Sequence, residues 1–207
     1  RDRSVSRGLG DVYKRQDVIR VGDTYYMIST TMFFSPGAPI MKSKDLVSWE
    51  LCSYVYDTLA DGDIQNLTNG KHDYAHGQWA ASLRYHNGIY YVFFGSYGTG
   101  KSYIYKTSDI EHGTWTRTEL NGMYYDASML FDDDGRVYLF HSTGQLTELK
   151  PDLTDVLPGG INQQIFERDA DEQGLLEGSS VIKHNGKYYL LMISMDWSIP
   201  GRLRREV

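Results

Sequence analysis

The sequence has little of several residue types, and each scarcity excludes something. Cys52 is the single cysteine among 207 residues, so no disulfide can form within the chain. The net charge of −6 argues against a nucleic-acid-binding protein, because a phosphate-binding surface needs a basic face. No apolar run approaches the roughly 20 residues of a membrane-spanning helix, so no membrane association is expected. Only 5 prolines accompany 21 glycines and 17 tyrosines, which favours short strands and turns over helices.

The first sixteen residues, RDRSVSRGLGDVYKRQ, differ from the rest of the chain. They are strongly basic and have no apolar period, and a clear strand pattern begins only at Asp17. We interpret residues 1–16 as a non-native or disordered leader, and residues 17–207 as the folded domain. The chain also stops abruptly at PGRLRREV, so we expect a fragment that is open at both ends. Its cellular location is left open.

Four segments share one pattern: an apolar strand, a turn that contains glycine, and a second strand that opens with aromatic residues. The turns supply the positive-φ positions that tight hairpins require. The segments recur every 47 to 65 residues or so, roughly the spacing of propeller blades. They are VIRVGDTYYMIST (18–30), SLRYHNGIYYVFFGS (82–96), MLFDDDGRVYLFHST (129–143) and VIKHNGKYYLLMIS (181–194).

Two of these hairpins precede a further strand pair. The pairs are IMKSKDLVSWEL (40–51) and IYKTSDIEHGTWTRTEL (104–120), and they give the four strands that a propeller blade needs. A β-sandwich also has regularly spaced turns, but the long repeat favours a propeller. The predicted fold is therefore all-β and a β-propeller.

Two carboxylates stand where the innermost strands of a propeller converge on its central channel. Asp126, in YYDASMLF, and Glu177, in LLEGSSVI, each lie three or four residues ahead of an apolar strand. Equivalent inward carboxylates in adjacent blades are what a two-acid hydrolytic centre would contain. Solvated charges at strand ends would give the same pattern.

The same stretches resemble glycoside hydrolase family 43, whose five-bladed β-propellers hydrolyse α-L-arabinofuranosyl and β-D-xylosyl linkages with inversion. The resemblance implies an all-β, five-bladed propeller of which about four blades are present. It implies that Glu177 is the general acid, and that Asp126 orients this acid and raises its pKa through a nearby negative charge. It covers the chain from Asp17 to the end, in DVIRVGDTYYM, GQWAASLRYHNGIYYVFFG, DASMLFDDDGRVYLF and LEGSSVIKHNGKYYLL.

The sequence departs from the family at the catalytic base. The family carries an Asp-Pro pair seven residues before the glycine that matches Gly22, and Arg15 and Gln16 stand there instead. Asp17 matches the variable residue two places on, a displacement of about 6 to 7 Å along the strand. We therefore do not assign Asp17 as the base. Since inversion requires a base, this polypeptide is expected to be nearly inactive although its parent is an enzyme.

Other candidate residues concern substrate binding. Trp79 matches a family tryptophan near the sugar, with core packing as the alternative, and His76 is a candidate substrate contact. Phe33 and Phe34 lie in a long loop that could shape the subsites. The acidic turn 132–135 lacks the spaced ligands of a calcium loop, so neither metal nor cofactor is expected. The expected partner is an oligosaccharide or polysaccharide, and the oligomeric state is left open.

Three alternatives remain. A sialidase carries Asp-box turns, but the spacing from Asp109 to Gly113 in TSDIEHGTW is too long by two residues. A non-catalytic carbohydrate-binding propeller would keep the pocket and lose the base. A four-blade fragment would also expose sheet edges and blade surfaces, and would be unstable alone.

Overall fold

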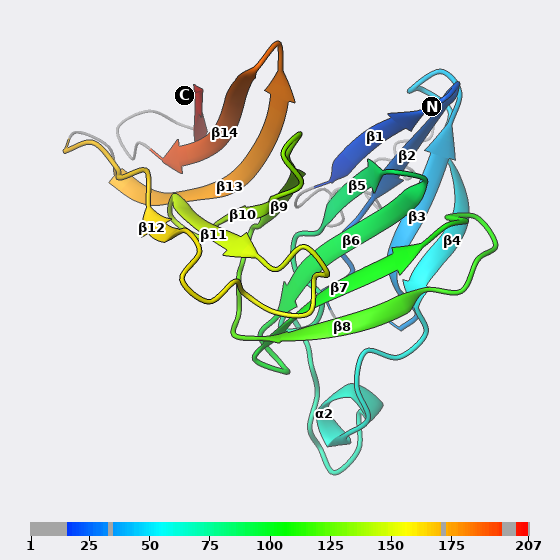
Figure 1. The fold of residues 1–207 in the computed structure, drawn as a ribbon. Coiled ribbons are helices and arrows are strands. Elements are labelled where there is room, and N and C mark those ends of the chain that lie inside the picture. The colour runs from blue at the N-terminus through cyan, green and yellow to red at the C-terminus, as the bar shows by residue number, and fades with distance from the viewer. Residues whose placement is uncertain (1–15, 33–34, 171–172, 196–201, 207) are drawn as a thin grey trace, which may run out of the picture.

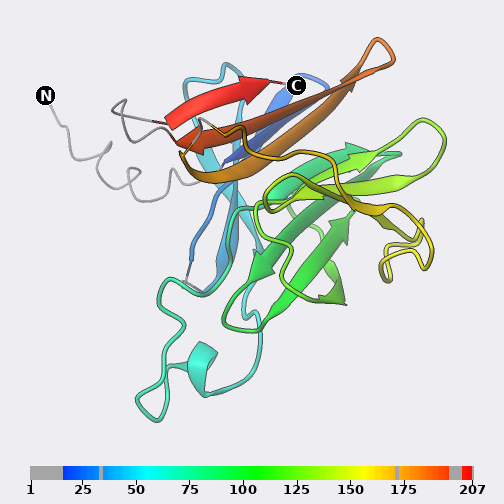
Figure 2. The same ribbon diagram turned by 90° about the vertical axis from the view of Figure 1, so that its left-hand side faces the viewer.

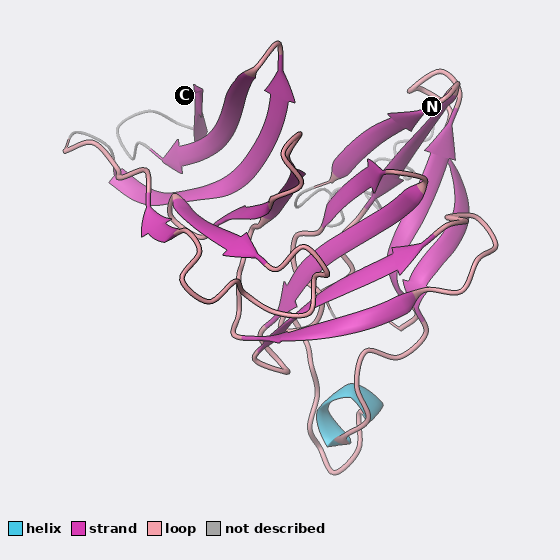
Figure 3. Cartoon of the chain, in the orientation of Figure 1, coloured by secondary structure: helices cyan, strands magenta, loops and turns pink. Residues whose placement is uncertain are grey.

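The computed structural model describes residues 16–32, 35–170, 173–195 and 202–206. Almost all regular structure in these ranges is strand, as Figure 3 shows. The one helix described there is the single turn α2 (Asp63–Asn66), in a loop that extends away from the sheets in Figures 1 and 2. No helix in the described ranges has the length and apolar character to cross a membrane.

The strands form four antiparallel sheets that follow one another along the chain (Figure 1). Within each sheet the strands are hydrogen-bonded in sequence order. The sheets are β1 (Asp17–Val21), β2 (Thr24–Ile28), β3 (Gly37–Ser43) and β4 (Glu50–Tyr56); β5 (Ser82–His86), β6 (Ile89–Ser96), β7 (Lys101–Thr107) and β8 (Thr116–Asn121); β9 (Ser128–Phe131), β10 (Val137–His141), β11 (Gln145–Leu149) and β12 (Asn162–Gln164); β13 (Gln173–His184), β14 (Lys187–Met195) and β15 (Arg202–Glu206).

The first strands of consecutive sheets lie against one another. Contacts join β1 to β5, β5 to β9, and β9 to β13. The sheets therefore spread around a common axis with their first strands innermost, as blades do. The predicted all-β propeller is confirmed, with four blades in the described residues, and the β-sandwich alternative is wrong.

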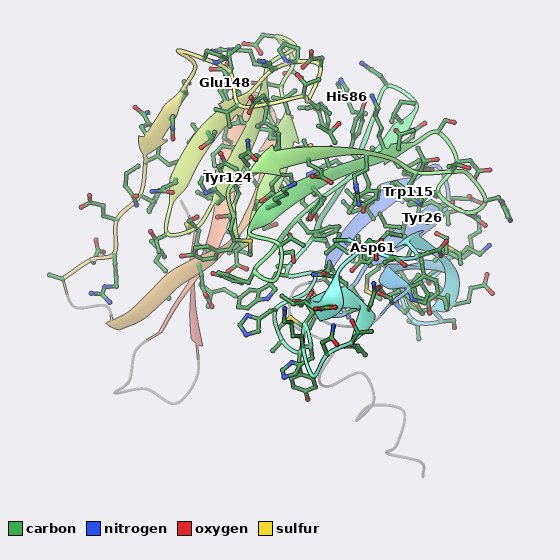
Figure 4. The ribbon with its side chains drawn as sticks, turned by 90° about the horizontal axis from the view of Figure 1, so that it is seen from below. Tyr26, Asp61, His86, Trp115, Tyr124 and Glu148 are labelled. Atoms are coloured by element: carbon green, nitrogen blue, oxygen red, sulfur yellow. The ribbon has the colours of Figure 1, made fainter. Side chains whose placement is uncertain are left out.

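The two consecutive tyrosines at the start of the second strand of a blade, Tyr90 and Tyr91 in the second blade, explain how neighbouring blades pack together. In the second blade, the ring of Tyr90 meets that of Tyr26 edge-on in the first blade, with centroids 5.7 Å apart. The next residue, Tyr91, lies 4.6 Å from Phe131 of the third blade. Because successive side chains of a strand point to opposite faces, one pair fills both interfaces. Trp115 packs on the same cluster as Tyr26, and Figure 4 shows the two near each other.

Three hydrophobic clusters fill the spaces between consecutive blades. Their central side chains are fully or almost fully buried, so each blade depends on its neighbours for burial. The clusters contain Ile40 with Leu83, Phe93 with Leu139, and Phe140 with Val181.

The hairpin turns have the backbone that their sequences predict. In the second blade, Asn87 and Gly88 have φ values of 51° and 82°. In the fourth, Asn185 and Gly186 have values of 49° and 72°. Two consecutive positive φ angles are the requirement of a type I′ hairpin turn, which asparagine followed by glycine satisfies best.

Candidate active site

The innermost strands are joined at their first residues by a repeated hydrogen bond. The side-chain oxygen of the first residue of one inner strand accepts from a backbone N–H of the next blade's innermost strand, at its second residue in β5 and β9 and farther along the strand in β13. These three strand-end hydrogen bonds identify equivalent positions in successive blades. They run from Leu83 N–H to Asp17 Oδ2 at 2.9 Å, from Met129 N–H to Ser82 Oγ at 3.1 Å, and from Val181 N–H to Ser128 Oγ at 3.0 Å.

Asp126 lies two residues before the strand-end acceptor Ser128. It is buried, with 4% of its surface exposed, and its φ of 55° is in the left-handed region. Aspartate tolerates this conformation better than most residues, and such backbone often occurs at functional positions. The preceding peptide is fixed because Ser142 N–H donates to Tyr125 O at 2.9 Å. The carboxylate of Asp126 is therefore held on a defined backbone at the mouth of β9.

Glu177 lies three residues before Ser180, the position equivalent to Ser128, but β13 contains an irregularity between the two. Glu177 pairs with Ile193 and Ser180 pairs with Leu191, so the β13 segment has one residue more than its partner. Gly178, with φ of 79°, supplies the positive φ that such a β-bulge needs. The bulge puts half-buried Glu177 at the level that a regular strand would give to the residue two before Ser180.

Counted from the equivalent positions Ser128 and Ser180, and allowing for the bulge, Asp126 and Glu177 are consequently the same number of steps away on two adjacent inner segments, which we call their common level. The sequence offsets differ, since Asp126 is three residues before Met129 and Glu177 is four before Val181. The bulge accounts for this difference. The arrangement offers one buried and one half-buried carboxylate at one end of the axis.

Counting two residues back from Asp17 along the sequence gives residue 15, the family's base position. Arg15 lies outside the described residues. Gln16, where the family has proline, has an amide nitrogen that is buried without a hydrogen-bond partner among the described residues. A buried unpaired polar group costs about 1–3 kcal/mol, so glutamine is poorly suited to this position.

Asp17 is already engaged. Its Oδ2 accepts from Leu83 N–H at 2.9 Å and forms an ion pair with the guanidinium of Arg84 at 2.5 Å. Only 22% of the Asp17 side chain is exposed. These contacts agree with the interpretation that Asp17 is not the base.

The predicted substrate-binding residues lie in and beside the loop that enters the second blade. Half-buried Trp79 donates from Nε1 to Ala75 O at 3.1 Å, and its ring meets Tyr97 edge-on at 4.6 Å. It adjoins Ala80, the residue two before Ser82, so it lies beside the level of the two carboxylates. The side chain of His76 is exposed. Phe34, like Phe33, lies outside the described residues.

The acidic turn 132–135 serves a structural contact between blades. Asp132, 6% exposed, accepts hydrogen bonds from Lys183 and Tyr188 of the fourth blade. Lys183 also contacts Asp133 at 2.7 Å. In the described part of the chain, no group of three or more histidine, cysteine or acidic side chains has the arrangement of a metal site.

Three residues of this region were missed from the sequence. His141 is 4% exposed, and its ring nitrogens lie 2.8 Å from Ser142 Oγ and 2.8 Å from Thr147 Oγ1. Burial lowers the pKa of His141 to about 4, so the ring is neutral at pH 7. Tyr124 packs edge-on against it at 5.0 Å, just before the Asp126 turn. The third is Arg84, whose signal was a charge between Leu83 and Tyr85 in the middle of an inner strand.

Comparison with known proteins identifies the family. The sequence profile described as glycosyl hydrolases family 43 matches residues 10–196. The chain belongs to glycoside hydrolase family 43. The predicted membership is thereby confirmed, and a propeller hydrolase of another family, such as a sialidase, is excluded.

The relatives of this family 43 chain include larger proteins. A solved structure of a bifunctional GH43-CE protein from Bacteroides eggerthii is 46% identical with a TM-score of 0.83, over 88% of this chain and 25% of that one. A β-xylosidase of Formosa agariphila is 27% identical, over 87% of this chain and 32% of its own. An extracellular endo-α-(1→5)-L-arabinanase of Bacillus subtilis is 28% identical, over 89% and 59%. The chain therefore spans a quarter to three-fifths of the length of these relatives.

Proposed function

We propose that this family 43 chain forms four blades of an inverting glycosidase. Its substrates are α-L-arabinofuranosyl or β-D-xylosyl linkages in plant hemicellulose or its oligosaccharides. The observation that carries the proposal is the common level of Asp126 and Glu177 on adjacent inner strands, where the bulge at Gly178 offsets the extra residue. The names of the β-xylosidase and arabinanase relatives support pentose-containing substrates.

Each carboxylate has one role in this proposal. Glu177, which is half-buried, protonates the leaving-group oxygen. Buried Asp126, which precedes the adjacent inner strand, orients that acid in the role that the family resemblance implies. Trp79 provides an aromatic wall for the sugar, and His76 and Phe34 contribute further contacts.

The missing base determines what this polypeptide itself can do. Inversion needs a carboxylate that activates water on the opposite face of the sugar ring. Residue 15 is the position for that group, and arginine cannot act as a base at neutral pH because its guanidinium stays protonated. We therefore expect the 207-residue chain with Arg15 to have almost no glycosidase activity. A second candidate function follows from the same observation, namely a carbohydrate-binding propeller without catalysis.

The decisive experiment restores the base. We would compare the chain with the R15D/Q16P variant, each alone and each joined to the residues that follow the matched segment in the Bacteroides eggerthii relative. The assay is release of p-nitrophenol from the α-L-arabinofuranoside and the β-D-xyloside. We expect turnover only after restoration. Adding Glu177→Gln should then abolish turnover and leave sugar binding largely intact. Glu50→Gln, at an exposed residue of β4, serves as the control.

Two results would contradict parts of this proposal. Unchanged turnover in the Glu177→Gln variant would remove Glu177 from the role of general acid. A folded, restored chain that binds xylo-oligosaccharides without hydrolysing either substrate would favour the binding propeller.

A further inference from the structure

The guanidinium of Arg84 lies where all four inner strands meet. Arg84 belongs to β5, and only 17% of its side chain is exposed. Its nitrogens donate to one group on β1, two on β9 and one on β13, and to the carbonyl of the preceding residue. The contacts are Nη1 to Asp17 Oδ2 at 2.5 Å and to Leu83 O at 2.7 Å, Nε to Met129 O at 2.7 Å, and Nη2 to Ser128 Oγ at 2.6 Å and to Val181 O at 3.4 Å.

The chemistry of arginine suits this junction. The planar guanidinium presents five N–H donors at fixed angles and stays charged at any working pH. Each strand that it binds is therefore held at a set height relative to the others. A lysine at this position would offer a single ammonium on a flexible stem, which cannot donate to several separate groups from fixed in-plane directions as a guanidinium does.

Ser128, one of the residues that Arg84 binds, lies two residues along the chain from a candidate carboxylate, and the other partners lie at similar distances along their strands. Ser128 is two residues after Asp126, and Asp17 is two residues after the base position. Val181 follows Ser180, whose level is two steps from that of Glu177 across the bulge. Two residues along a strand correspond to about 6 to 7 Å. Arg84 thus fixes the strands just beneath the level where the chemistry is proposed.

We infer that Arg84 is a positioning residue, which sets the relative heights of the inner-strand segments that carry Asp126 and Glu177. The effect of Arg84 on turnover rests on the proposed glycosidase function. Its effect on the placement of the two carboxylates holds for a binding propeller as well. The competing interpretation is a purely structural junction, whose loss would lower stability and leave the carboxylates as they are.

The first test uses the 207-residue chain as it stands. The titration midpoints of the Asp126 and Glu177 carboxyls would be followed by carbon-13 NMR in wild type, Arg84→Met and Arg84→Lys. Arg117→Met is the matched control, since Arg117 also bonds a backbone carbonyl, Leu59 O at 2.6 Å, but from the outer strand β8. We expect Arg84→Met to move at least one midpoint by about 0.5 or more, and the control to move neither.

The second test uses the restored R15D/Q16P chain. Misplacing reacting groups by about 1 Å can cost 10²-fold in rate, so Arg84→Met should lower kcat about 100-fold and change KM less than threefold. Arg84→Lys should recover no more than a tenth of the wild-type kcat, and Arg117→Met should keep it. Melting temperatures measured in parallel separate misplacement from unfolding, and Arg84→Lys keeps the charge if Arg84→Met does not fold.

The outcomes distinguish the two proposals. Unmoved midpoints in folded Arg84→Met and Arg84→Lys variants, or an equal loss of kcat in Arg117→Met, would overturn the positioning role. Moved midpoints in a restored chain without turnover would support that role and contradict the glycosidase proposal.

Discussion

The ion pair between the third and fourth blades should stabilise the protein only while Asp132 is ionised. Burial raises the pKa of Asp132, but hydrogen bonds from Lys183 and Tyr188 outweigh it and bring the pKa from 3.8 to about 2. The gap corresponds to about 2 kcal/mol of stability at pH 7. Asp132→Asn removes the charge and nearly keeps the shape. We therefore expect this variant to lose about 2 kcal/mol at pH 7, or roughly 4 to 8 °C in Tm for a domain of this size.

The sign of the pH dependence makes the prediction specific. A folded-state pKa below the unfolded value stabilises the fold at pH above 3.8, and this contribution disappears as the pH falls through about 2. The difference between wild type and Asp132→Asn should accordingly shrink to about half by pH 3.

Urea unfolding of both proteins, monitored by tryptophan fluorescence at pH 7 and pH 3, measures this difference. Asp133→Asn is the control, because Asp133 pairs with the same Lys183 but its side chain is 86% exposed. The control should cost less than about 0.5 kcal/mol. An Asp132→Asn penalty that is absent at pH 7, or equal at both pH values, would refute the reasoning.

Three further predictions concern the surroundings of the site. Gly178→Val places a β-branched residue at a φ of 79°, so it should cost about 1–2 kcal/mol in urea unfolding and abolish turnover in the restored chain by displacing Glu177. Stability should fall as the pH drops from 6.5 towards 4, because the unfolded chain takes up a proton that buried His141 does not; His141→Gln should flatten this part of the curve. Trp79→Ala should weaken xylobiose binding in calorimetry about tenfold, or about 1.4 kcal/mol. Unchanged binding with a lower Tm would show that Trp79 is a packing residue.

The sequence was most informative at the first hairpin of each blade, where a tight turn is followed by a strand that opens with aromatic side chains. Tyr90 and Tyr91 adjoin a turn of asparagine and glycine, and together they define a hairpin with both faces buried. That pattern predicted the first two strands of each blade and the spacing between blades. The outer strands were less legible. Strand β12 (Asn162–Gln164) is three residues long and fully exposed, so it has no apolar period to detect.

The sequence predicted equivalent inward positions for the two candidate acids, but only to within the difference between three and four residues before an apolar strand. The sequence leaves open whether an offset of three or four residues matters, since one residue normally moves a side chain to the opposite face. Only the pairing of β13 with β14 reveals the bulge that corrects the offset of Glu177. Arg84 shows a different limit. Its partners outside its own strand come from three separate segments of the chain, and no local pattern brings them together.

At the ends of the inner strands, the residues that join the blades differ from the residues proposed to carry the chemistry. The three strand-end hydrogen bonds use the side chains of the first residues of β1, β5 and β9, such as Ser82, and so do not depend on the side chain two places earlier. That earlier level holds Ala80 in the second blade, Asp126 in the third and, through the bulge, Glu177 in the fourth. A small apolar residue and two acids are thus compatible with the same blade geometry. The contacts that join the described blades therefore place no demand for a carboxylate on that level, and the proposed base is a requirement of the chemistry rather than of these contacts.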